Sequence, residues 1–175
     1  MSHNVEVHDL AWLACAIDAE GSVYTYPHRT TAGRVSIMVR VEVCNTDPRF
    51  TDKALEIAKA LCPEGYQPSL SSQMTVTGKP LWRMNVQSYV SCECVLTAVL
   101  PYLIVKKDKA ETMLAWVRHR LQGGHKRRGG IKSVYTEEDH RVAESLFGVK
   151  LDNLPIRRVG YNRNPNPPVI TPTPI

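Results

Sequence analysis

The sequence contains no long apolar run, no secretion signal, and no cysteine spacing typical of a disulfide framework or a zinc finger. A membrane-spanning helix needs ~20 consecutive apolar residues, which no segment approaches, so we expect no membrane partner. The N-terminus lacks the basic start and apolar stretch of a signal peptide. The 5 cysteines form no Cys-x-x-Cys pair, and the 6 histidines show no metal-ligand spacing. We therefore expect an intracellular protein, in the cytoplasm, nucleoid or an organelle, and not a secreted one.

Basic residues are present in excess, and they are concentrated in the second part of the chain. Residues 1–100 hold 8 Lys or Arg and 10 Asp or Glu, whereas residues 101–175 hold 14 and 7. Such a surplus suits a polyanion, either nucleic acid or a membrane surface; the alternative is a solvated basic loop. The length of 175 residues and the 43% apolar content fit one globular domain with its own core.

The order of predicted elements is helix, hairpin, helix, hairpin, helices. Asp9 is expected to cap a helix over residues 10–17 that stops at Gly21. Hairpins are predicted at 22–44 and around a turn at 77–80, and further helices at 46–61, 91–100, 106–121 and 136–148. We expect an α+β domain at 1–150, in αββαββα order, with a four-stranded antiparallel sheet and helices on one face. The proline-rich tail, 151–175, is expected to be extended or disordered.

The strands alternate so that one sheet face is apolar and the other carries long hydrogen-bonding side chains. Arg reads guanine and Asn or Gln reads adenine in the major groove, so the polar face is a candidate DNA reader. The alternatives are an ordinary solvated face and, for Met38, simple filling of space. The expected DNA-contacting residues are Tyr24, Tyr26, His28, Arg34, Ser36, Met38, Arg40, Glu42, Ser71, Gln73, Thr75, Arg83, Asn85 and Gln87, with Lys126, Arg127 and Arg128 on phosphates.

Two acidic residues, Asp18 and Glu20, lie at the predicted C-terminal end of the first helix. The helix macrodipole disfavours negative charge there by ~0.3–1 kcal/mol, so these acids oppose local stability. If two such helices packed about a two-fold axis, the acidic ends would meet and repel unless a cation lay between them. Carboxylate oxygens favour Mg²⁺ or Mn²⁺. The alternative is a solvated acidic helix end.

Residues 13–21, Leu-Ala-Cys-Ala-Ile-Asp-Ala-Glu-Gly, resemble the signature of the LAGLIDADG homing endonuclease family, with departures at Cys15, Ala16 and Glu20. Val-Cys-Asn-Thr-Asp-Pro at 43–48 and Leu-Pro-Tyr-Leu-Ile-Val-Lys-Lys-Asp-Lys-Ala-Glu at 100–111 extend the resemblance, which covers about residues 8–122. It implies a homodimer formed through the motif helix, with Trp12, Leu13, Cys15 and Ala16 in the interface.

The same resemblance implies a role for each site residue. Glu20 and the Ala19 carbonyl correspond to metal ligands, with aspartate usual at the position of Glu20, while Asp18 corresponds to a structural acid. Asn45 corresponds to a water-organising residue, and Arg49 and Lys106 to basic residues near the cleaved phosphates, with Lys107 as a competing match for Lys106.

The implied function is hydrolysis of phosphodiester bonds in double-stranded DNA, at a long pseudo-palindromic site and with Mg²⁺ or Mn²⁺. Two rival functions stay open. One is a cleavage-inactive relative that binds DNA or acts as an intron RNA maturase. The other is a scaffold with a basic tail that does not bind nucleic acid. A salt titration of its association with DNA would then show no dependence on salt concentration.

Overall fold

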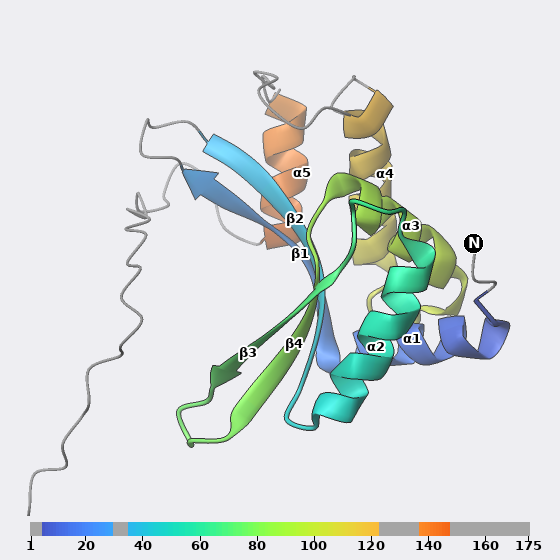
Figure 1. Ribbon diagram of the computed structural model, residues 1–175. Helices are drawn as coiled ribbons and strands as arrows, with labels where there is room; N and C mark the ends of the chain where they lie inside the picture. The colour runs from blue at the N-terminus through green and yellow to red at the C-terminus, as the bar shows by residue number, and fades with distance from the viewer. Residues whose placement is uncertain (1–4, 30–34, 123–136, 148–175) are drawn as a thin grey trace, which may run out of the picture.

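The computed structural model describes residues 5–29, 35–122 and 137–147. Its helices lie together on one side of a twisted sheet (Figure 1). The elements in chain order are α1 (Val7–Glu20), β1 (Gly21–Arg29), β2 (Val35–Asn45), α2 (Pro48–Leu61), β3 (Ser69–Met74), β4 (Pro80–Val86), α3 (Tyr89–Val99), the 3₁₀ turn η1 (Leu100–Tyr102), α4 (Lys107–Gln122) and α5 (Glu137–Phe147).

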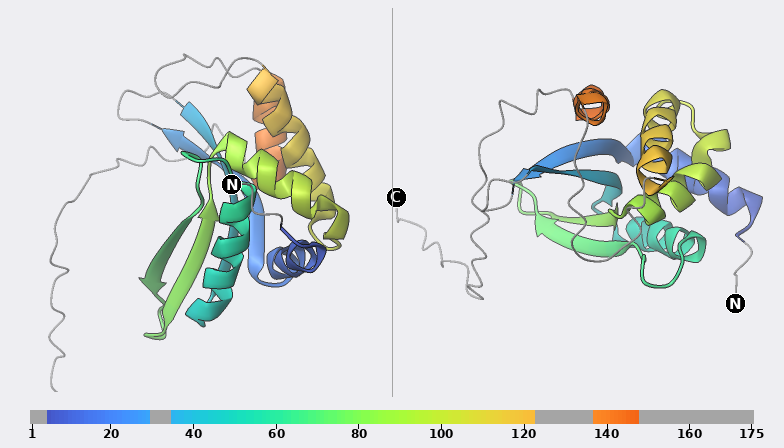
Figure 2. Two further views of the ribbon diagram at one scale, coloured as in Figure 1. Left: turned by 45° about the vertical axis from the view of Figure 1, so that its right-hand side comes forward. Right: turned by 90° about the horizontal axis from the view of Figure 1, so that it is seen from above.

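The four strands form one antiparallel sheet in the order β1-β2-β4-β3. Within β2, the side chains of Val39, Val41 and Val43 are fully or almost fully buried, as their alternation predicts. Met84 and Val86 of β4 continue this buried face. The expected α+β fold, with a four-stranded antiparallel sheet covered by helices on one face, is confirmed (Figure 2).

Helix α5 is held to the rest of the domain by buried polar contacts. Asp139 accepts a hydrogen bond from the Trp116 indole at 2.7 Å and from the Arg120 guanidinium at 3.0 Å, so α5 is tied to α4. Thr25 of β1 donates to the Ala143 carbonyl at 2.9 Å. Burial makes each of these bonds costly to leave unmade. They extend the helical layer to the edge strand β1.

The beginning of α1 differs from the prediction that Asp9 caps it. Glu6 precedes the helix without a side-chain cap, and Asp9 lies within the first turn. The Asp9 carboxylate lies 3.0 Å from Nζ of Lys53 on α2. The Asp9 side chain, which the sequence predicted as a helix cap, therefore forms an ion pair between α1 and α2 instead.

Several expectations fall on residues that the structure does not describe. These are Arg34, the basic loop with Lys126, Arg127 and Arg128, the cap at Thr136, and the tail at 151–175. Among the described helices, none combines the length and the apolar character needed to cross a membrane.

Candidate functional site

Asp18 fastens the C-terminal end of α1 to the segment that leads into α4. Its carboxylate accepts backbone N–H bonds from Ile104 at 2.7 Å, Val105 at 3.1 Å and Lys106 at 2.9 Å. Partial burial raises the pKa of Asp18, but these three bonds and the Lys106 charge lower it by more, so the pKa is below its ordinary value of 3.8. Asp18 thus has the structural role that the sequence resemblance implies.

The Lys106 side chain folds back onto the end of α1. Its Nζ donates to the backbone carbonyl of Asp18, so the ammonium group lies at the carbonyl end of the helix. This position is favourable because the macrodipole is negative there. Lys107, the competing match, begins α4 and is exposed. Of the two lysines, Lys106 is the one held beside the motif residues.

Glu20 is the last residue of α1, and its side chain is exposed. Among the described residues, no hydrogen bond or ion pair engages its carboxylate. Gly21 then turns the chain directly into β1. A Cβ at Gly21 would lie 2.5 Å from the Glu42 carbonyl oxygen and 2.8 Å from the Ile17 backbone, so only glycine fits. This close approach fixes Glu20 at the junction of helix and sheet.

The end of α1 offers oxygen atoms that suit a hard divalent cation. The last carbonyls of a helix lack partners within it. Gly21 N–H and Lys106 Nζ engage those of Ile17 and Asp18, and the carbonyls of Ala19 and Glu20 follow them at the end of the helix. Within the described part of a single chain, no three His, Cys, Asp or Glu side chains are grouped to hold a metal ion. The Ala19 carbonyl and the Glu20 carboxylate are oxygen donors of the kind that Mg²⁺ takes.

Asn45 and Arg49 lie at the junction of β2 and α2. The Asn45 side-chain oxygen accepts from the Asp47 backbone N–H at 2.9 Å, and Asp47 caps α2 through the Arg49 N–H at 3.0 Å. The Arg49 guanidinium forms an ion pair with Asp47 at 2.5 Å, yet its side chain is 89% exposed. Asp47 was not predicted as part of the site, although the Asp-Pro pair marks a helix start.

The four residues expected in a dimer interface do not share one exposed face. Leu13 and Ala16 are 0% and 2% exposed because they belong to the core of their own chain, which corrects their assignment. Trp12 is half-buried against Phe50, with ring centroids 5.1 Å apart. Cys15 is exposed. The exposed stripe of α1 begins at Val7 and continues, four residues apart, through the small residues Ala11, Cys15 and Ala19.

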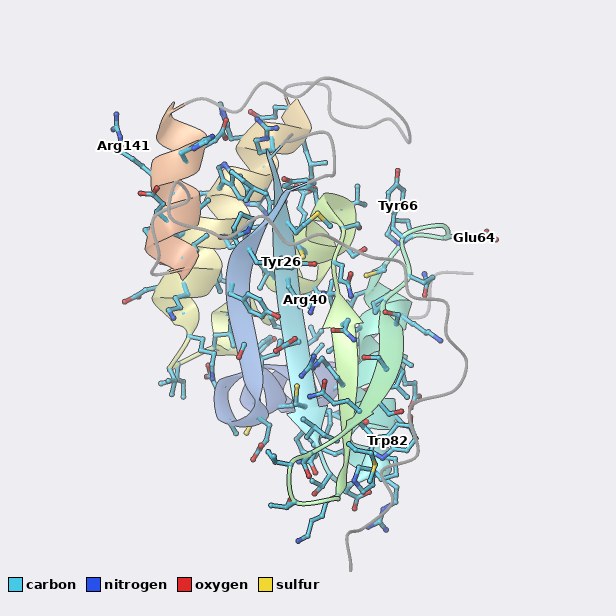
Figure 3. The ribbon with its side chains drawn as sticks, turned by 90° about the vertical axis from the view of Figure 1, so that its left-hand side faces the viewer. Tyr26, Arg40, Glu64, Tyr66, Trp82 and Arg141 are labelled. Carbon is cyan, nitrogen blue, oxygen red and sulfur yellow. The ribbon has the colours of Figure 1, made fainter. Side chains whose placement is uncertain are left out.

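The open sheet face carries a bonded cluster of four residues from β1 and β2, with Tyr26 and Arg40 side by side at its centre (Figure 3). The Arg40 guanidinium donates to the hydroxyls of Tyr24 at 3.3 Å and Tyr26 at 3.1 Å. Tyr24 donates to the Glu42 carboxylate at 3.0 Å. These residues occupy the predicted face, but they are engaged with one another.

On β4, the two predicted readers differ in accessibility. Asn85 is 4% exposed, and its amide donates to the Ser71 hydroxyl at 3.0 Å. The expectation that Asn85 reaches a base is therefore wrong for this arrangement, because its amide is covered and satisfied. Arg83 is partly exposed, and its Nε donates to Cys44 at 3.3 Å. Cys44 had not been predicted to take part.

The remaining expected readers fall into three groups. Met38, Ser71 and Gln73 lie in strands on the open face. Thr75 lies in the β3–β4 turn, where it bonds Lys79, and Gln87 follows β4 and is exposed. His28 and Ser36 lie in strands, but their side chains are outside the described set.

A cavity of about 500 Å³ lies elsewhere, between the start of α1 and α2. It is lined by Val5, Asp9, Glu56, Ile57, Lys59, Ala60 and Gln67. None of these residues belongs to the predicted site. The predicted site residues therefore lie outside the lining of this cavity.

No family model and no curated protein matches the sequence. Solved structures do match the fold. The homing endonuclease I-CvuI, in complex with the I-CreI target, is 18% identical over 82% of this chain and 99% of its own, with a TM-score of 0.54. The group I intron-encoded homing endonuclease I-CeuI with DNA is 12% identical over 71% and 61%, TM-score 0.54.

The LAGLIDADG homing endonuclease I-GzeII, in complex with its DNA target, is 11% identical, with a TM-score of 0.57. The match covers 78% of this chain but 44% of I-GzeII. The chain therefore has a DNA endonuclease fold, and specifically that of the LAGLIDADG homing endonucleases.

Proposed function

We propose that this chain is one subunit of a site-specific DNA endonuclease of the LAGLIDADG family, active as a homodimer with divalent metal. The observation that carries the proposal is the end of α1. There an exposed Glu20 carboxylate without a partner among the described residues lies two positions after Asp18, which accepts hydrogen bonds from the Lys106 backbone N–H and side chain. An acid that is unfavourable for its helix and engaged by no described group is well suited to an external ligand.

Pairing of two chains would complete the site. I-CvuI is matched over 99% of its length and I-GzeII over 44%, so this fold occurs both as a whole chain and as less than half of one. The exposed small residues of α1, Ala11, Cys15 and Ala19, would let a second α1 approach closely. Two Glu20 carboxylates would then lie near the two-fold axis.

In such a dimer, the Glu20 carboxylate and the Ala19 carbonyl would hold Mg²⁺ or Mn²⁺; I-CvuI structures were obtained in the presence of Mg and of Ca. The metal would supply charge stabilisation and a more acidic bound water. Lys106 and Arg49 would offset the charge on the phosphate. Asn45, whose side-chain oxygen is engaged by Asp47, would orient water through its amide nitrogen.

The test is a selection of cleaved duplexes from a randomised DNA library with Mg²⁺, followed by the Glu20→Gln variant. We expect Glu20→Gln to keep DNA binding, lose cutting and fold at least as stably as the parent chain. Glu64→Gln is the matched control, because Glu64 is exposed and lies in a loop apart from α1 (Figure 3). Sequence-selective DNA binding without any cleavage would favour the cleavage-inactive relative. Binding that does not weaken as salt rises would exclude both the endonuclease and the inactive DNA-binding relative.

A further inference from the structure

The open sheet face carries two arginines whose guanidinium groups are placed differently. Both Nη atoms of Arg40 donate to tyrosine hydroxyls, at 3.3 Å to Tyr24 and 3.1 Å to Tyr26. The Arg40 guanidinium carbon also lies 5.0 Å from the Tyr26 ring centroid. Its Nε is buried without a described partner. Arg40 is therefore held inside the cluster by its neighbours.

Arg83 is held by one edge only. Its Nε donates to the Cys44 sulfur at 3.3 Å and lies 3.7 Å from the Glu42 carboxylate. No described residue bonds its Nη1 or Nη2, and its side chain is 26% exposed, against 19% for Arg40. The Arg83 guanidinium is thus anchored through Nε, while its two terminal nitrogens have no partner among the described residues.

Glu42 connects the two arginines. One of its oxygens accepts from Tyr24 at 3.0 Å and lies within 3.8 Å of Arg40 and 3.7 Å of Arg83. Its side chain is 13% exposed, so this carboxylate is largely taken by protein groups. Because Glu42 is itself held by Tyr24, it restrains the Arg83 side chain before DNA binds. Arg83 then loses less conformational entropy on binding.

We infer that Arg83 reads a guanine in each half-site of the DNA target, that Glu42 and Cys44 position it, and that Arg40 neither positions it nor contacts that guanine. A planar fork with two free N–H-bearing nitrogens matches the O6 and N7 acceptors of guanine in the major groove. The inference rests on the proposed DNA-binding function and adds to it which residue recognises which base.

The experiment selects bound duplexes from a randomised library at fixed salt, using the parent chain and a matched pair of variants. Arg83→Lys and Arg40→Lys each keep the charge, lose the fork and lie on the same face. We expect the parent consensus to contain one guanine per half-site whose preference falls about tenfold or more in Arg83→Lys. Arg40→Lys keeps that guanine, and both variants keep the salt dependence of binding.

Glu42→Gln tests positioning, because it keeps the acceptor for Tyr24 and removes the charge. The same guanine preference should weaken while other positions of the consensus stay. Circular dichroism and thermal unfolding verify folding, and Arg83→Gln is the second variant if Arg83→Lys does not fold. A consensus that Arg83 variants leave unchanged, or a guanine lost in Arg40→Lys instead, overturns the inference but not the proposed function. A parent chain that enriches no sequence overturns both.

Discussion

Replacing Asp18 by asparagine keeps the shape of the side chain but turns one of its two oxygens into a donor. In the structure both oxygens accept backbone N–H groups, two at Oδ2 and one at Oδ1. Asp18→Asn therefore loses one or two bonds and places a donor against a donor. A hydrogen bond to a charged group contributes ~1.5–3 kcal/mol, less when solvent reaches it, so we expect a loss of about 1–3 kcal/mol.

The pH dependence of this loss has a definite sign. The folded-state pKa of Asp18 is lowered below its ordinary value of 3.8. The stabilisation is therefore fully present at neutral pH and disappears as the pH falls through the folded-state pKa. The gap in unfolding free energy between Asp18→Asn and the parent should stay constant from about pH 7 to pH 5 and shrink below about pH 4.

Urea unfolding across this pH range measures the gap, and thermal unfolding should show a drop of about 2–12 °C at pH 7. Asp52→Asn is the control, because Asp52 is exposed on α2, where substitutions stay within about 0.5 kcal/mol. Equal stability of Asp18→Asn and the parent at pH 7, or a gap undiminished at pH 3, would refute the role assigned to Asp18.

Three further predictions concern α1 and the cysteines. Gly21→Ala should cost about 1–3 kcal/mol in urea unfolding, because its Cβ would meet backbone atoms at 2.5–2.8 Å; a neutral effect contradicts the close approach. Ala11→Glu should give monomers in sedimentation while Ala115→Glu, at a position on α4 that is also exposed, does not; the same oligomeric state for both variants would refute the α1 interface. A thiol reagent at pH 8 should label Cys62 in the urea-unfolded chain but spare it in the native protein, since burial raises the pKa of Cys62 to about 12.

Local sequence predicted the elements well, because each depends on a short-range period or on a helix boundary. The alternation through Val39, Val41 and Val43 set the buried face of β2, and Asp47-Pro48 marked the start of α2. The pairing of β2 with β4, which makes one sheet from two hairpins, depends on contacts about 40 residues apart. Such pairing leaves no local signal in the sequence.

The site was predicted by residue type but not by exposure. Helix α1 is apolar on nearly every side, so its pattern could not show that Leu13 and Ala16 face the core while Ala11, Cys15 and Ala19 remain outside. On the sheet, alternation placed Asn85 on the polar face correctly. Only the bond to Ser71 shows that its amide is covered. Exposure depends on neighbours that fold next to a residue from elsewhere in the chain.

The two motif acids separate once their surroundings are known. Both lie where the dipole of α1 disfavours negative charge by ~0.3–1 kcal/mol. For Asp18, three N–H groups at the entrance to α4 offset that cost, and the acid stabilises the domain. For Glu20, no described group offsets it, so Glu20→Gln should leave stability unchanged or slightly raised. Because no described group of its own chain engages the Glu20 carboxylate, it is available to a partner from outside, and the partner that we propose is a metal ion shared with a second copy.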